Sequence, residues 1–119
     1  TALADALKVN GVLKNIDLCG NSFGTEGWCA IFAALRDNKE NKIESWHLSA
    51  QGINTEIAKV LAEYVSVSRV LTNLNLNDNQ LCGIDFLGLG TYSAAGITAL
   101  AEALKVNGVM KTLGLSGNR

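Results

Sequence analysis

The chain has 119 residues, with 10 Lys and Arg against 11 Asp and Glu and a formal net charge of −1. This balance argues against a phosphate-driven nucleic-acid binder and against a polybasic membrane-surface element. A hydrophobic fraction of 48% is too high for a disordered chain. The longest apolar run, residues 28–35, is far shorter than the roughly 18 residues of a membrane-spanning helix. We therefore expect one domain, no nucleic-acid partner and no direct membrane insertion.

An internal repeat dominates the sequence. Residues 1–21 and 98–118 are identical at 15 of 21 positions, at an offset of 97. The pattern apolar-x-x-apolar-x-Leu-x-x-Asn occurs at 13–21, 71–79 and 110–118, and at 43–51 with Gln in place of Asn. The first positions of these copies are 30, 28 and 39 residues apart. A repeat of this length indicates stacked supersecondary units that share one core.

Each copy joins a helix to a short strand. Apolar residues four apart predict helices around residues 3–7, 31–35, 61–65 and 100–104. The three-then-two spacing of the motif predicts a short strand after each helix, at 13–18, 43–48, 71–76 and 110–115. Asn54 or Thr55, and Ser93, are expected to begin helices. Asn10-Gly11 and Asn107-Gly108 are expected to end them, with the Gly in the left-handed conformation.

The motif, with Ala- and Leu-rich helices such as ALAEALKVNG, resembles the leucine-rich repeat over essentially all 119 residues. The subtype resembles ribonuclease inhibitor and the repeats of NOD-like receptors. This resemblance implies an α/β solenoid, a right-handed superhelix with a curved parallel sheet on its concave face and helices on its convex face. It also implies a structural ladder of amides that turns the chain, formed by Asn21, Gln51, Asn79 and Asn118. Gln51 departs from the motif and predicts a looser turn.

Residues 1–119 are interpreted as a single leucine-rich repeat domain of about four repeats. No polar capping repeat is visible at either end, although solenoids usually require one. The sequence therefore suggests either a fragment of a longer array or an accessory subunit of a larger assembly.

Polar residues occupy the strand positions that the repeat places on the concave face. They are Asn15, Asp17, Cys19, Ser45, His47, Ser49, Asn73, Asn75, Asn77, Thr112 and Ser116. Strands about 4.8 Å apart would align Asp17, His47 and Asn75 in one row. A Cys, a His and an Asp in one patch could support nucleophilic catalysis, but a sheet face offers neither a pocket nor an oxyanion hole. We expect no catalytic residue here and a partner-binding role instead, with a pH-sensitive contact at His47 as an alternative.

Because the last spacing is longer than the others, an insertion of about 11 residues follows Asn79 and is expected to form a loop at about residues 80–92. It is rich in apolar side chains, and its candidate partner-binding residues are Ile84, Phe86, Leu87, Leu89 and Tyr92. We expect the loop to fold back and bury these groups on its own repeat. The alternative is an exposed apolar tongue that docks a partner.

The chemistry of the remaining residues points away from a cofactor. Three Cys and one His do not supply a metal site, so no metal and no cofactor are expected. Cys19, Cys29 and Cys82 are odd in number and indicate reduced thiols in an intracellular compartment such as the cytoplasm.

These observations favour a non-enzymatic protein–protein interaction or scaffold module, which binds another protein or a multi-subunit complex through the concave face or the inserted loop. Two alternatives stay open. One is a GTPase-activating protein that resembles the Ran GTPase activator, and the other is the ligand-sensing repeat domain of a NOD-like receptor. GTPase activation would require charged residues concentrated at one rim, whereas Arg36, Arg69 and Arg119 form no recognisable motif.

Overall fold

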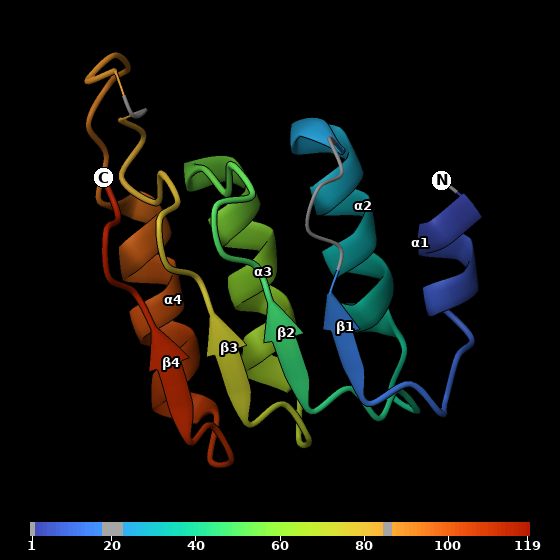
Figure 1. The fold of residues 1–119 in the computed structure, drawn as a ribbon. Coiled ribbons are helices and arrows are strands. Elements are labelled where there is room, and N and C mark those ends of the chain that lie inside the picture. Colours follow the sequence, from blue (N-terminus) through green and yellow to red (C-terminus); the bar gives the residue numbers. More distant parts are fainter. Residues whose placement is uncertain (1, 18–22, 85–86) are drawn as a thin grey trace.

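The computed structural model describes residues 2–17, 23–84 and 87–119. Within these residues, four helices alternate with four strands: α1 (Ala2–Leu7), β1 (Asn15–Asp17), α2 (Gly24–Asp37), β2 (Ser45–His47), α3 (Thr55–Val67), β3 (Asn73–Asn75), α4 (Ala95–Val106) and β4 (Thr112–Gly114). The strands form one parallel sheet in the order β1-β2-β3-β4, and the helices line up beside one another along it (Figure 1). The expected α/β class with a parallel sheet is confirmed. No helix of the described residues is long and apolar enough to cross a membrane.

The strand register aligns equivalent residues of the four units. Ile16, Trp46, Leu74 and Leu113 form one row across the sheet, and all four belong to the hydrophobic core or pack against it. Because successive side chains of a strand point to opposite faces, the positions on either side of this row face away from the helices. We call that side the open face of the sheet. Its strand residues are Asn15, Asp17, Ser45, His47, Asn73, Asn75, Thr112 and Gly114.

An aromatic cluster fills the core between α2, β2 and α3. Trp28, Phe32, Trp46 and Tyr64 are all buried. The ring of Phe32 lies 5.5 Å from the rings of Trp28 and Trp46 and 6.4 Å from that of Tyr64, measured between centroids. Such pairs contribute about 0.5–1.5 kcal/mol each beyond the area they bury. The buried aromatic side chains therefore pack together around the middle of the sheet.

Two helices begin where the sequence predicts. The side chain of Asn54 accepts a hydrogen bond from the Ile57 N–H at 3.0 Å and caps α3. The Ser93 hydroxyl accepts one from the Ala95 N–H at 3.2 Å, at the first residue of α4. Each side chain satisfies an N–H that the first turn of a helix leaves without a partner.

The expected role of glycine at the helix ends is wrong. Gly11 and Gly108 are not among the residues with positive φ. The preceding Asn makes the turn instead, because its side-chain oxygen accepts two N–H groups of the following residues. Asn107 accepts from Val109 and Met110, each at 2.8 Å, and Asn10 does the same for the residues at 12 and 13. The side chain thus turns the backbone without a left-handed residue.

The turn that follows β3 is held by the buried amide of Asn79. Its Nδ2 donates to the carbonyls of Leu48, at 2.8 Å, and Leu76, at 3.0 Å. Its Oδ1 accepts from the N–H groups of Gln51, at 3.0 Å, and Ile53, at 2.9 Å. One side chain therefore ties the turns after β2 and β3 together.

The other members of the predicted amide ladder make fewer bonds between units. Asn118 Nδ2 donates to the carbonyls of Leu76, at 2.8 Å, and Leu115, at 2.9 Å, while its Oδ1 is buried with no partner among the described residues. The Gln51 side chain donates only to Ser49 and Ala50 of its own turn. Asn21 lies outside the described residues.

Candidate functional site

The open face of the sheet gathers the polar strand residues that the repeat pattern singles out. Asp17, His47, Asn75 and Gly114 share one row, with Asp17 and His47 exposed. Asn15, Ser45, Asn73 and Thr112 form the neighbouring row. Both rows carry short polar side chains or glycine, so this face presents hydrogen-bonding groups on a layer that lacks apolar anchors.

Beyond the strands, the open face is extended by residues whose backbone N–H groups bond to Asn side chains. The Asn75 side-chain oxygen accepts the N–H of Asn77 at 3.0 Å, and the Asn77 side-chain oxygen accepts the N–H of Ser116 at 2.9 Å. Ser49 lies half-buried at the corresponding place after β2. Cys19 lies outside the described residues.

The described residues offer little to support chemistry on this face. Three pockets of about 190, 230 and 310 Å³ are lined by residues of loops and helices, not by those of the two rows. No group of three or more His, Cys, Asp or Glu that could hold a metal occurs among the described residues. Cys29 and Cys82 are half-buried free thiols, and burial, aided by the charge of Glu56, raises the pKa of Cys29. A raised pKa leaves less of the reactive thiolate.

The inserted loop is exposed over most of its described residues, so the expected burial is wrong. Leu81 is buried, but Leu87, Leu89 and Tyr92 are 67%, 62% and 69% exposed. An antiparallel bridge joins Ile84 to Gly90, and the described part of this loop, which we call the tongue, projects beyond the N-terminal end of α4 (Figure 1). Phe86 lies outside the described residues.

Close backbone contacts hold the base of this tongue. Gly83 has a φ of +87°, and a Cβ there would lie 2.5 Å from the Thr91 carbonyl oxygen. Gly90 likewise lies against the Gly83 carbonyl. Both positions require glycine, because any side chain would collide with the opposite strand of the tongue.

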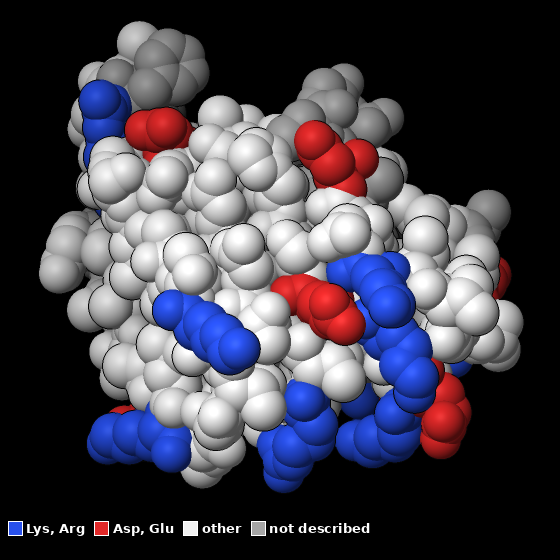
Figure 2. Space-filling view, turned by 60° about the horizontal axis from the view of Figure 1, so that its bottom comes forward, with Lys and Arg blue, Asp and Glu red and all other residues white. Residues whose placement is uncertain are grey.

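A concentration of positive charge at one edge of the sheet was missed by the sequence analysis. The last two residues of each helix and the segment that leads to the next strand, together residues 6–14, 36–44, 66–72 and 105–111, contain 8 of the 10 Lys and Arg but only 3 of the 11 Asp and Glu. In a parallel sheet these segments all lie on the side of the sheet where the strands begin. Figure 2 shows Lys and Arg gathered on this side, which we call the basic edge. The near-zero net charge hides this basic edge because the carboxylates lie mostly elsewhere.

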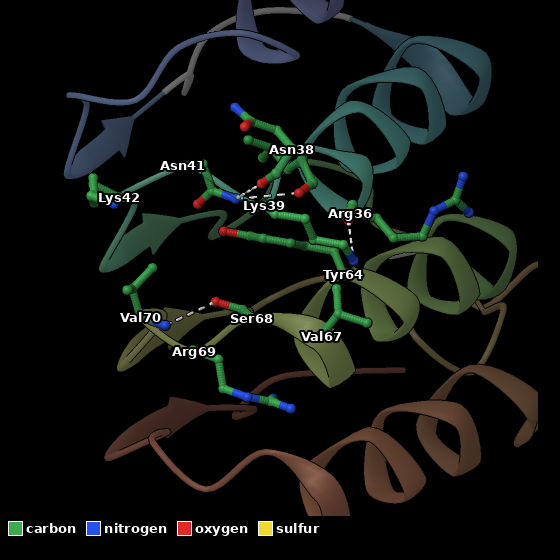
Figure 3. Close-up of a pocket in the computed structure, with 11 residues that line it drawn as sticks. Arg36, Asn38, Lys39, Asn41, Lys42, Tyr64, Val67, Ser68, Arg69 and Val70 are labelled. Atoms are coloured by element: carbon green, nitrogen blue, oxygen red, sulfur yellow. Dashed lines mark hydrogen bonds between the residues drawn. The ribbon is translucent and has the colours of Figure 1, made fainter.

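A pocket of about 230 Å³ opens at this edge between the segments before β2 and β3. Lys39, Lys42 and Arg69 are among its lining residues, which surround the ring of Tyr64 (Figure 3). Arg36 at its rim is already paired, through Nη1 to Glu63 at 2.6 Å and through Nε to Asp37 at 3.0 Å. Hydrogen bonds to Asp37 and then Glu63 raise the pKa of Arg36.

The floor of this pocket contains a polar atom that lacks a partner. Neither the Tyr64 hydroxyl nor the neighbouring Trp46 indole N–H makes a hydrogen bond of ordinary geometry within the described residues. Burial raises the pKa of the Tyr64 phenol, an effect that the nearby indole of Trp46 opposes in part. The hydroxyl is therefore neutral at physiological pH.

No family model matches the chain, and no curated protein matches it. Solved structures do match. Leiomodin-1 actin-binding site 2 is 19% identical with a TM-score of 0.74, and the match covers 99% of this chain. The tropomodulin C-terminal domain from Caenorhabditis elegans is 18% identical with a TM-score of 0.61, and 97% of this chain is covered. The chain spans 62% of the leiomodin-1 chain and 81% of the tropomodulin chain.

These neighbours correct the family resemblance. The chain has the fold of the leiomodin and tropomodulin domains, and its assignment to ribonuclease inhibitor and NOD-like receptor repeats was wrong. The motif indicates a short parallel strand followed by a turn that an Asn side chain stabilises. α/β domains of more than one family share this feature. A local motif of this kind therefore indicates the strand and the turn without separating the families.

Proposed function

We propose that this chain is a non-enzymatic protein-binding module and that actin is its partner. The observation that carries the proposal is the exposed apolar tongue, in which Leu87, Leu89 and Tyr92 all project into solvent. Exposed apolar groups that gather in one place typically mark a contact with another protein. Actin is the partner to test first, because the leiomodin-1 structure with this fold is an actin-binding site.

In this proposal the tongue supplies the apolar anchor and the open face supplies the polar surroundings. The proposed contact residues on the open face are Asn15, Asp17, Cys19, Ser45, His47, Ser49, Asn73, Asn75, Asn77, Thr112 and Ser116, and those on the tongue are Ile84, Phe86, Leu87, Leu89 and Tyr92. Interfaces commonly combine a few buried aromatic and aliphatic side chains with a polar rim. Asn79 and Asn118 have a structural role, because they hold turns together.

The proposal extends to the organisation of the chain. Residues 1–119 would act as one scaffold domain of four helix–strand units arranged as a solenoid, with the tongue as an insertion before the fourth unit. An actin partner would fit a cytoplasmic location and the free thiols of Cys29 and Cys82.

Cosedimentation with filamentous actin tests the proposal. We expect the chain to pellet with actin and the Leu87→Ser, Leu89→Ser double variant to bind at least about 10-fold more weakly. Val67→Ser is the matched control, because Val67 is an exposed apolar residue at the opposite, basic edge of the sheet. Failure of the unaltered chain to pellet at roughly 50 µM actin would exclude actin. Equal binding by the double variant would show that the tongue does not contact actin.

GTPase activation, the alternative function, has no structural observation in its favour. Arg36 is bound by Asp37 and Glu63 and is not presented to a partner. A GTP-hydrolysis assay with a small panel of GTPases separates this activity from binding, since a binding module leaves the hydrolysis rate unchanged.

A further inference from the structure

The pocket of about 230 Å³ at the basic edge lies in the middle of the molecule, between the second and third units. One of its walls comes from the end of α2 and the segment before β2. The other wall comes from the end of α3 and the segment before β3 (Figure 3). Both β2 and β3 pair with a strand on each side. The pocket is therefore built by the inner units of the sheet.

Side-chain hydrogen bonds hold both walls of this pocket. On the wall before β2, Asn41 Nδ2 donates to the carbonyl of Asn38 at 2.7 Å. On the wall before β3, the Ser68 hydroxyl oxygen accepts the N–H groups of Val70, at 3.3 Å, and Leu71, at 3.0 Å. Side chains that bond nearby backbone groups fix the shape of a turn. The walls are thus preformed, which reduces the entropy that is lost when a ligand binds.

The charged side chains that line the pocket are all cations. They are Arg36, Lys39, Lys42 and Arg69, and no Asp or Glu of the described residues lines it. Arg36 is neutralised by Asp37 and Glu63. Lys42 and Arg69 are exposed and form no ion pair with the part of the chain that the structure describes. Because they lie on opposite sides of Tyr64 (Figure 3), two uncompensated positive charges line the pocket from its two walls.

The floor of the pocket supplies a neutral donor, the hydroxyl of Tyr64. Tyr64 is fully buried, and its hydroxyl is directed between Asn41 and Ser68 of the two walls (Figure 3). The nearby Trp46 indole N–H can only donate, and no described residue accepts the Tyr64 proton. A buried donor without an acceptor is costly. An oxygen atom of a bound ligand would remove this cost.

We propose that this pocket binds the phosphate group of a small solute. Lys42 and Arg69 balance its charge from the two walls, and the Tyr64 hydroxyl donates to one of its oxygens from the floor. Three donors that approach from different directions suit a tetrahedral oxyanion, and the guanidinium of Arg69 can bind two of its oxygens at once. The pocket is smaller than the roughly 300–1,000 Å³ typical for drug-sized ligands, so inorganic phosphate or a small phosphate ester is the ligand.

A ligand reaches the floor when exposed side chains at the mouth of the pocket rotate. The Tyr64 hydroxyl is shielded from bulk water, whereas Lys39, Lys42 and Arg69 are exposed. Lys39 makes a long hydrogen bond of 3.5 Å, from its Nζ to the Arg36 carbonyl. Exposed side chains of this kind change rotamer within nanoseconds. Access therefore requires side-chain rotation and leaves the walls in place.

The lining also predicts which anions compete. Because no carboxylate of the described residues lines the pocket, no carboxylate there accepts a proton from the ligand, and a dianion without a proton is bound equally well. Sulfate should therefore displace phosphate. Chloride at equal ionic strength should not, since it lacks oxygens that three donors can share.

Titration of the isotope-labelled chain with inorganic phosphate, followed by NMR at constant ionic strength in sodium chloride, tests this site. We expect shifts that saturate below roughly 50 mM phosphate and are largest in residues 38–43 and 67–71. Lys42→Gln, Arg69→Gln and Tyr64→Phe should each weaken binding about 10-fold. Lys111→Gln is the matched control, because Lys111 belongs to the basic edge but does not line the pocket, and it should bind like the unaltered chain.

Far-UV circular dichroism establishes that the variants fold. If Tyr64→Phe does not fold, Lys42→Gln and Arg69→Gln still test the site, since both replace exposed side chains. Shifts that do not saturate, equal weakening in Lys111→Gln, full affinity in any of the three pocket variants, or a failure of sulfate to compete would each overturn the proposal. These outcomes do not depend on actin binding, because the pocket and the tongue share no residue.

Glycerol phosphate distinguishes the two sources of the phosphate group. Binding at least as tight as that of inorganic phosphate assigns the site to a small phosphate ester, whose carrier projects from the mouth of the pocket. Weaker binding assigns the site to free phosphate.

Discussion

The middle and end units of this chain carry the same residue columns in different surroundings. Leu71 of the third unit is fully buried, whereas Leu13, in the same column of the first unit, is 40% exposed. Asn79 bonds the turns of two units, whereas the equivalent Asn118 has a buried oxygen without a partner among the described residues. The repeat supplies the chemistry, and the number of neighbours decides how much stability each residue contributes.

The largest difference in stability between the middle and end units is expected when a leucine of the same core column is truncated to alanine. Leu71→Ala removes a side chain buried on all sides and should lower the free energy of unfolding by about 3 kcal/mol, from lost burial and the cavity left behind. Leu13→Ala should cost about 1 kcal/mol, because much of that side chain already contacts water. Urea unfolding measures both variants. Equal losses would show that the end units are as tightly covered as the middle ones.

The next largest difference in stability is expected when the Asn side chains that hold the turns are removed. Asn79→Ala leaves the N–H groups of Gln51 and Ile53 and the Leu48 carbonyl without their partner, and should cost about 3 kcal/mol. Asn118→Ala removes an amide whose oxygen is already without a partner, and should cost about 1 kcal/mol. The same urea titrations compare them. A larger loss in Asn118→Ala would reverse the order that the hydrogen bonds predict.

The turns of the second and fourth units both contain a left-handed residue, but its type differs. Ala50 has a φ of 56°, where the fourth unit has Gly117 with a φ of 68°. The left-handed conformation costs a residue with a Cβ about 1 kcal/mol, so Ala50→Gly should raise the free energy of unfolding by somewhat less than that, since glycine gains entropy in the unfolded chain. Thermal unfolding provides the measurement. Ala62→Gly within α3 is the control, and it should be destabilising.

The smallest effect concerns the buried phenol between the second and third units. Tyr64→Phe removes a hydroxyl that makes no hydrogen bond of ordinary geometry, and should leave stability at pH 7 unchanged or raise it by less than about 1 kcal/mol. Burial raises the pKa of Tyr64 above its ordinary value of 10.0. The unfolded chain therefore releases this proton first, and stability falls as pH rises above 10.

The Phe variant should lack that alkaline loss, which unfolding curves between pH 8 and 11 would detect. A variant that loses stability at pH 7 would show that the hydroxyl does have a partner in solution. An alkaline slope equal to that of the unaltered chain would show that other groups cause it.

Periodicity along the chain was enough to predict the α/β class, the strand rows and two helix starts. Spacings of two and four residues determine which side chains share a face of a strand or helix, and this holds whatever the neighbours are. The side chains of Asn54 and Ser93 bond N–H groups only two or three residues away. Their role was therefore visible in the sequence.

Tertiary structure decided everything that depends on distant segments. The bridge of Ile84 to Gly90 leaves the tongue exposed, the parallel topology gathers eight cations at one edge, and within the described sheet the outer strands β1 and β4 each pair with one neighbour. The Asn side chains, and not the glycines, turn the helix ends. Each outcome arises from contacts between residues that are remote in sequence or from competition between side chain and backbone, which the spacing of apolar residues does not encode.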